Sequence, residues 1–281
     1  MLKILLHALK TGIVTGRYPQ QAEPAPGLRG RPRIDFERCT ACDQCALACP
    51  TQAISLVEDA GSRTVRLSLA SCIFCGLCEP ACPQGAIRIT EEFELAALGK
   101  TRLQVSGVFA RQPDGSYRLH AVHDPAQDEA ELAALVKSLA ERSHRLFRRS
   151  LHLREVDAGS CNGCELEISA LQNPRYDLER LGIQLVASPR HADGLLVTGP
   201  VTRNMKEALQ KTYDALPEPK LVVAVGACAC GGGMFGRSYA TLGGVDQLLP
   251  VDVYIPGCPP RPQALLHGIL MAMGRAEERL R

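Results

Sequence analysis

The chain has 281 residues, of which 46% are hydrophobic and 4% aromatic, and its formal net charge is +2. This length points to about two domains with enough apolar material for buried cores. A nucleic-acid partner is not expected, because base stacking needs aromatic residues and a polyanion needs a strongly basic surface. No run reaches the roughly 18 consecutive apolar residues of a membrane-spanning helix.

Residues 1–30 are expected to form an amphipathic helix and a connector. Such a helix either lies on a membrane or on a membrane subunit, or packs on its own domain. The stretch 24–32 is rich in proline, glycine and arginine, as connectors are. On a helical wheel one face holds Leu2, Leu5, Leu6, Leu9 and Ile13, and the opposite face holds Lys3, His7 and Lys10.

Eight cysteines form two copies of the pattern C-x2-C-x2-C-x3-C-P, ending at Pro50 and Pro83. This is the bacterial ferredoxin spacing for a pair of [4Fe–4S] clusters, in which the fourth cysteine of each run ligates the other cluster. We therefore assign the cysteines to two sets, one for each cluster. Set 1 is Cys39, Cys42, Cys45 and Cys82, and set 2 is Cys72, Cys75, Cys78 and Cys49.

Two other uses of cysteine fit this spacing less well. A structural zinc site would show two close pairs separated by roughly a dozen or more residues. A disulfide framework is typical of short chains in oxidising compartments. A cubane requires the observed density, because each of its four irons takes one thiolate. Since thiolate ligands require a reducing compartment, we expect a cytoplasmic protein.

The two runs belong to an internal repeat with an offset of 33 residues. The repeat continues past the prolines, where Ala53 and Ile54 match Ala86 and Ile87. We predict short strands at 53–57 and 86–90. Residues 31–102 are thus expected to form an α+β ferredoxin domain made of two pseudo-symmetric halves.

Residues 103–150 are expected to form a hairpin and a helical linker. Apolar-rich runs at 105–109 and 117–122 flank a Pro-Asp-Gly turn, as in a hairpin, and the polar stretch 124–129 marks the linker. Helical spacing follows at Leu132, Leu135, Val136 and Leu139. The basic residues after it are either a solvated helix end or a docking surface for an acidic partner or lipid headgroups. They are Arg142, Arg145, Arg148, Arg149 and Arg154.

From residue 151 to residue 281, apolar strands alternate with helical patterns. This alternation predicts an α/β domain of flavodoxin-like type, with a parallel sheet covered on both faces. Strands are predicted at 151–156, 183–187, 195–198, 221–225 and 251–255, and helices at 165–172, 203–216 and 261–273.

The remaining cysteines follow predicted strands of that sheet. Because the carboxyl ends of parallel strands meet at one edge, Cys161, Cys164, Cys228 and Cys258 are expected to converge there as set 3. Glycines beside them would let backbone N–H groups approach a third [4Fe–4S] cluster. Zinc is the alternative for this set. Cys230 is either a buried spectator or an alternative fourth ligand, and the glycine-rich stretch 226–236 lacks both nucleotide-loop patterns.

Both halves of the chain resemble known families. The segment SCIFCGLCEPACPQGAIRITEEFELA, with LKTGIVTGRYP near the start, resembles the two-cluster ferredoxin subunit of formate hydrogenlyase-type hydrogenases and of respiratory complex I. GSCNGCELEI, SPRHADGLLVTGPVT, GACACGGGMF and VDVYIPGCPPRP resemble the small subunit of group 4, energy-converting [NiFe] hydrogenases, which is homologous to the complex I subunit that carries the terminal cluster. The resemblance implies a fusion of two usually separate subunits. The C-x2-C at Cys161 and Cys164 is the hydrogenase-type spacing, whereas three glycines after Cys230 depart from the family pattern.

The resemblance implies an electron-transfer subunit with three [4Fe–4S] clusters in series. Its expected partners are a [NiFe] large subunit, integral membrane subunits and an external low-potential electron donor or acceptor. The complex would lie on the inner face of the cell membrane. The first alternative is the equivalent subunit of a quinone- or sulfur-reducing relative of complex I. The second is a stand-alone protein that uses its clusters for sensing or as a scaffold.

No catalytic centre is expected on this chain, because no residues suited to nickel are found. Glu165 and Glu167 beside set 3 either pass protons or simply solvate a helix start. His191 is expected to be a structural hydrogen-bonding residue and not a ligand.

Overall fold

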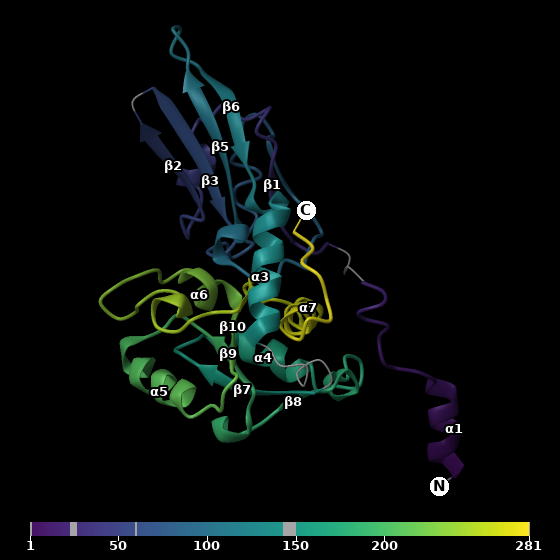
Figure 1. The fold of residues 1–281 in the computed structure, drawn as a ribbon. Helices are drawn as coiled ribbons and strands as arrows, with labels where there is room; N and C mark the ends of the chain where they lie inside the picture. The colour runs from purple at the N-terminus through teal and green to yellow at the C-terminus, as the bar shows by residue number, and fades with distance from the viewer. Residues whose placement is uncertain (1, 23–26, 60, 143–149, 281) are drawn as a thin grey trace.

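The computed structural model describes residues 2–22, 27–59, 61–142 and 150–280. An antiparallel lobe lies at one end of the molecule and a parallel α/β lobe at the other (Figure 1). The predicted fold class, a ferredoxin domain followed by an α/β domain, is confirmed.

The antiparallel lobe contains two sheets. Strand β1 (Pro32–Ile34) pairs with β4 (Ile87–Ile89), and a four-stranded sheet has the order β2-β3-β5-β6. The two strands related by the 33-residue repeat, β2 and β4, therefore lie in different sheets. The four-stranded sheet consists of β2 (Ile54–Asp59), β3 (Ser62–Ser68), β5 (Gln104–Arg111) and β6 (Tyr117–His123), and the short helix α2 is Gln44–Leu47.

Strand β3 is absent from the sequence prediction. Its segment, SRTVRLS, has two apolar residues, Val65 and Leu67, and both are buried. Alternation over so short a stretch is a weak signal, and the strand is instead specified by pairing on both sides, with β2 and with β5.

The predicted hairpin is β5 and β6. Its turn is held by Asp114, whose Oδ1 accepts a hydrogen bond from the Ser116 N–H at 2.9 Å, and by Gly115 at φ 83°. Because β5 pairs with β3, the hairpin extends the ferredoxin sheet. The division of the chain at residue 103 stays a prediction.

The linker continues into a short turn and a helix. Asp124 caps η2 (Pro125–Gln127), and α3 spans Glu129–Arg142. Of the predicted basic cluster, Arg145, Arg148 and Arg149 lie outside the described residues, and Arg154 is half-buried in β7.

The α/β lobe has a five-stranded sheet in the order β11-β10-β9-β7-β8, and every neighbouring pair of its strands is parallel. Its strands are β7 (Leu151–Asp157), β8 (Ile183–Leu185), β9 (Gly194–Thr198), β10 (Leu221–Val225) and β11 (Val253–Ile255). Its helices are α4 (Gly163–Ala170), α5 (Arg203–Asp214), α6 (Gly226–Gly231) and α7 (Pro262–Ala272). Short 3-10 turns are η1 (Lys100–Leu103), η4 (Leu178–Leu181), η5 (Pro189–His191) and η6 (Val245–Gln247).

Both faces of the parallel sheet are buried, and its side chains alternate between two cores. In β10, Val222 and Ala224 join a core shared with α5, α6 and the ferredoxin lobe. Leu221, Val223 and Val225 face the opposite core, beneath α4 and α7. One apolar core therefore runs continuously from the ferredoxin lobe onto one face of the sheet, so the two lobes pack directly against each other.

The N-terminal helix α1 (Leu2–Thr11) stands apart from the rest of the molecule (Figure 1). None of its residues is buried, so it does not pack on its own domain as one alternative proposed. Among the described residues, none of the helices has both the length and the apolar character needed to cross a membrane.

Candidate iron–sulfur sites

The eight cysteines of the ferredoxin lobe line two cavities of similar size. The four cysteines of set 1 line one cavity, and the four cysteines of set 2 line the other. Cys82 lies in the cavity of the first run and Cys49 in that of the second, although each belongs by sequence to the other run. This is the exchange that the ferredoxin spacing predicts. The thiols surround a space, as a cubane requires, whereas a single zinc ion would draw four sulfurs to about 2.3 Å.

The two cysteine loops repeat the same backbone conformation. Ala41 and Phe74, which are equivalent in the 33-residue repeat, both have left-handed φ angles, 53° and 56°. At these turns the Ala41 N–H donates to Cys39 Sγ and the Phe74 N–H to Cys72 Sγ, each at 3.4 Å. Such hydrogen bonds to sulfur tune the potential of a bound cluster. The repeat therefore preserves the sulfur environment as well as the sulfur positions.

The thiols of each set lie close enough to repel one another when charged. The pKa of Cys45 is raised to about 12, mainly by burial and in addition by charge repulsion from Cys39, Cys42 and Cys82. In set 2, the pKa of Cys72 is raised to about 12, mainly by burial and in addition by charge repulsion from the other three thiols of that set. Thiolates gathered in this way need bound cations, which iron would supply.

The cysteines of set 3 converge from three strand ends of the α/β lobe. Cys161 and Cys164 lie between β7 and the first turn of α4, Cys228 lies on α6 after β10, and Cys258 follows β11. The pKa of Cys228 is raised to about 11, mainly by burial and in addition by charge repulsion from Cys258 and Cys161. Burial and the other three thiols also raise the pKa of Cys164.

Glycines make room for the sulfurs of set 3. A Cβ on Gly226 would lie 2.6 Å from Cys164 Sγ, and one on Gly233 would lie 2.9 Å from Cys228 Sγ. Both glycines also have left-handed φ angles, 86° and 49°. The glycine-rich stretch begins with a short helix, α6, which packs against β10 and β11.

Set 3 opens to the surface. Cys161 and Cys258 are exposed, whereas Cys45 and Cys78 of the ferredoxin sets are buried. Three apolar side chains near the set 3 cysteines in sequence are also exposed: Leu166, Met234 and Phe235. An exposed apolar group of this kind is typical of a surface that a protein partner covers.

The other candidate residues lie as follows. One carboxylate oxygen of Glu165 accepts a hydrogen bond from Thr198, while its second oxygen is buried without a partner among the described residues. Glu167 is half-buried, and burial raises its pKa. His191 is exposed on η5, and no hydrogen bond of its ring is found in the described part of the chain.

The surplus thiol, Cys230, is fully buried, and its Sγ donates to the Ala224 carbonyl at 3.5 Å. This placement agrees with a spectator role. Within the described ranges all thirteen cysteines are free, and no group of His, Cys, Asp or Glu side chains forms a single-ion metal site. The assignment of ligands to clusters stays a prediction.

Comparison with known proteins defines the class of this chain. Residues 161–272 match the family model of the NADH ubiquinone oxidoreductase 20 kDa subunit, and residues 38–86 match a 4Fe-4S dicluster domain. The chain is 49% identical over 146 residues to the probable membrane-bound hydrogenase subunit mbhJ of Pyrococcus furiosus, covering 52% of this chain and 87% of that one. It is 45% identical over 156 residues to formate hydrogenlyase subunit 7 of Escherichia coli, covering 56% of this chain and 60% of that one.

Among solved structures, one chain of an archaeal membrane-bound sulfane sulfur reductase is 39% identical, with 47% of this chain and 75% of that one covered and a TM-score of 0.41. The fold and the sequence matches together define an iron–sulfur electron-transfer subunit of an oxidoreductase complex. The chain belongs to the 20 kDa subunit family of NADH–ubiquinone oxidoreductase, with a 4Fe-4S dicluster domain joined to it in one polypeptide.

Proposed function

We propose that this chain relays electrons to or from the [NiFe] site of a partner large subunit, in a membrane-bound, energy-converting hydrogenase-like complex. The single observation that supports this most is the sorting of twelve cysteines into three sets, at two cavities and one exposed strand edge. When bound, three [4Fe–4S] clusters would supply one-electron transfer. Both relatives named above are hydrogenase-type subunits by name.

The placement of set 2 beside set 3 supports a relay. Ser71, next to Cys72, donates through its Oγ to the carbonyl of Gly231 at the end of α6, at 3.3 Å. A Cβ on Gly231 would lie 2.7 Å from the Ala70 carbonyl oxygen, so only glycine permits this approach. The loop that holds set 2 therefore packs directly on the helix that holds Cys228.

The exposed side of set 3 is the proposed contact with the large subunit. The thiols of Cys161 and Cys258 face solvent in the isolated chain, as do three apolar side chains that follow other set 3 cysteines in sequence. The equivalent subunit of a quinone- or sulfur-reducing complex is the second candidate, because the family model itself is that of a quinone-linked enzyme. The hydrogenase-type spacing of Cys161 and Cys164 favours the first candidate.

The metal content of the purified complex tests this function. When the tagged chain is isolated anaerobically with its partners, we expect nickel, and about twelve irons on this chain because each cubane holds four. Iron without nickel would favour the quinone- or sulfur-reducing alternative. A chain that purifies alone and exchanges no electrons with low-potential donors would contradict the relay.

We further propose that α1 holds the chain against the inner face of the cell membrane. Its apolar side chains are exposed, its charged side chains are basic, and the segment after it is fixed to the α/β lobe. The Gly16 N–H donates to the Arg175 carbonyl at 2.7 Å, and the Arg180 side chain donates to the Tyr18 carbonyl at 2.6 Å. An amphipathic helix with this composition binds anionic lipid headgroups.

Replacing Leu5 with glutamate is expected to weaken binding to vesicles of anionic lipid at least tenfold, because burying one leucine is worth roughly 1.5–3 kcal/mol and roughly 1.4 kcal/mol is a factor of ten. Co-sedimentation of the complex or of the full chain with the vesicles measures the effect. Thr11→Glu adds the same charge on the opposite side of the helix and is the matched control. Equal loss in both variants would indicate that charge alone is responsible, and no loss in either would contradict the membrane contact.

A further inference from the structure

We propose that residues 97–103, here called the joint segment, set the separation between the set 2 and set 3 sites, and that Arg102 and Glu278 are the positioning residues that fix it. This deepens the proposed relay and rests on it. Electron transfer between two centres falls steeply with their separation. A chain that carries both sites on different lobes therefore needs a rigid connection between them.

One end of the joint segment is bonded to the set 2 loop. The Leu103 carbonyl accepts a hydrogen bond from the Leu69 N–H at 2.7 Å. The Leu69 carbonyl in turn accepts from the Cys72 N–H at 3.3 Å. Two backbone hydrogen bonds thus connect the joint segment to the first cysteine of the second run, so a shift of residue 103 would move that loop.

The other end of the joint segment is bonded to the elements that hold set 3. Ala97 pairs with Tyr254 through two backbone hydrogen bonds, at 2.9 and 2.8 Å, on the strand that leads to Cys258. The Lys100 ammonium contacts both carboxylate oxygens of Asp246, at 3.1 and 2.9 Å. Asp246 belongs to η6, and the preceding Gly244 lies against the carbonyls of α6, the helix of Cys228.

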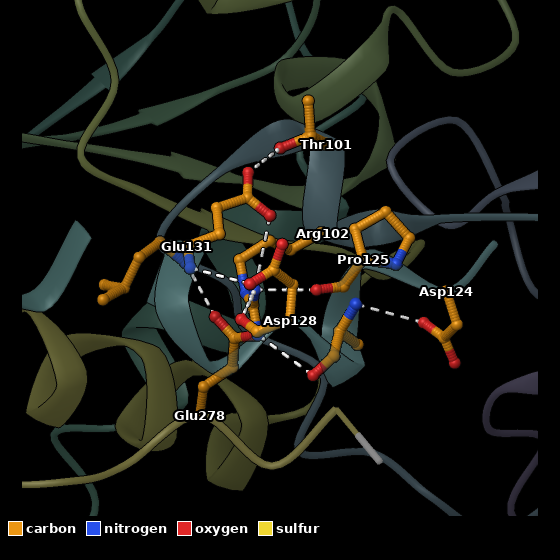
Figure 2. A network of polar contacts seen from close by, with 9 residues as sticks. Thr101, Arg102, Asp124, Pro125, Asp128, Glu131 and Glu278 are labelled. Atoms are coloured by element: carbon orange, nitrogen blue, oxygen red, sulfur yellow. Dashed lines mark hydrogen bonds and ion pairs between the residues drawn. The ribbon is translucent and has the colours of Figure 1, made fainter. Parts of the chain in front are cut away.

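Arg102 holds the joint segment near its C-terminal end, beside Leu103. Its side chain and that of Glu278 are each 1% exposed, and its Nε donates to Glu278 Oε1 at 2.6 Å (Figure 2). The remaining nitrogens donate to backbone carbonyls of the linker: Pro125 at 2.7 Å, Ala126 at 3.0 Å and Asp128 at 3.0 Å. A guanidinium buried in this way is held in one geometry by its fixed fork of donors.

Glu278 connects the C-terminal part of the chain to the joint segment, because its first carboxylate oxygen binds Arg102. Its second oxygen, Oε2, accepts from the Leu98 N–H of the joint segment at 3.2 Å. On either side of it, the Glu277 carbonyl contacts His267 Nε2 on α7 at 2.9 Å, and Arg279 pairs with Glu94 at 2.5 Å. Residues 277–279 therefore bind α7 of the α/β lobe and the chain just before the joint segment at the same time.

The pair is suited to positioning for a physical reason. An apolar contact would permit small rotations of one lobe on the other, because dispersion contacts are non-directional. A buried ion pair in which each guanidinium nitrogen donates to a particular carbonyl or carboxylate permits only small rotations, if any. The network joins segments that are 176 residues apart in sequence, so it constrains the tertiary arrangement and not merely a local turn.

The test uses the full chain with its clusters, reduced by dithionite, and needs no partner subunit. We expect Glu278→Gln and Arg102→Lys to retain the iron and the spectrum of each cluster. The magnetic coupling between the reduced clusters of set 2 and set 3 should weaken, and electron transfer between them should slow about tenfold. Arg102→Met should show a larger change. Arg33→Met, which breaks the exposed pair with Glu92, is the matched control and should change neither.

Unchanged coupling and rate in Glu278→Gln and Arg102→Lys, both with full iron content, would overturn the proposal. A change of the same size in Arg33→Met would also overturn it, because the effect would then not be specific to the joint segment. If Arg102→Met loses its iron, the two milder variants decide the question. A wild-type chain that lacks a third cluster would instead refute the proposed function, and the iron content distinguishes these two failures.

Discussion

Replacing Cys228 with serine is expected to lower the iron content of the chain from about twelve atoms to about eight, because one of three cubanes would lose a ligand. Cys228 is the set 3 residue on α6, where the backbone at Gly233 is packed against its sulfur. A serine oxygen is a harder and weaker ligand for these irons than a thiolate. Electron transfer to the partner subunit should fall to background, while both ferredoxin clusters keep their spectra.

Cys230 provides a matched control on the same helix. It lies two residues further along, but its thiol is buried and donates to the Ala224 carbonyl. Cys230→Ala is therefore expected to keep about twelve irons and nearly full electron transfer. Iron analysis and electron paramagnetic resonance of the anaerobically prepared variants measure both outcomes. Loss of about four irons from Cys230→Ala, with none from Cys228→Ser, would exchange the roles of these two residues.

Replacing Cys82 with serine is expected to destroy the cluster of the first run, although Cys82 belongs to the second. Cys49→Ser should destroy the cluster of the second run in the same crossed manner. The reason is the exchange of the fourth cysteines between the two cavities. Cys82 lines the cavity of the first run and Cys49 lines that of the second. Each thiol is therefore expected to ligate the cluster of the other run and not that of its own.

Two further variants identify which signal is lost. Cys39→Ser reports the cluster of set 1, and Cys72→Ser reports that of set 2. The resonance spectrum of Cys82→Ser should match that of Cys39→Ser, and the spectrum of Cys49→Ser should match that of Cys72→Ser. The opposite pairing would show that each run binds its own cluster, and the assignment of both sets would then be wrong.

Local spacing was enough to predict the ferredoxin loops. Three cysteines at intervals of three residues must form a tight turn around one group, and the 33-residue repeat placed the second turn in register with the first. The structure extends this repeat to the backbone, since Ala41 and Phe74 share a left-handed conformation. Neither residue is a glycine, so composition gave no indication of these turns.

Strand alternation was enough to predict the parallel sheet and the edge at which set 3 gathers. A residue that follows a buried parallel strand lies at the carboxyl edge whatever the strand order is, which is why Cys228 and Cys258 could be placed together. Strand β3 and helix α6 could not be predicted in this way. Their formation depends on neighbours distant in sequence and not on a local pattern of apolar residues.

The amino-acid sequence by itself determined the two fold types and their order along the chain, and it predicted the cysteine sets, because each depends on spacing within short segments. Only the tertiary structure decided how the two lobes meet. The pair of Arg102 and Glu278, the approach of Gly231 to Ala70, and the exposure of α1 all depend on contacts between segments far apart in the chain. A buried arginine and an exposed one look alike in sequence, since burial is a property of the folded neighbours and not of the residue.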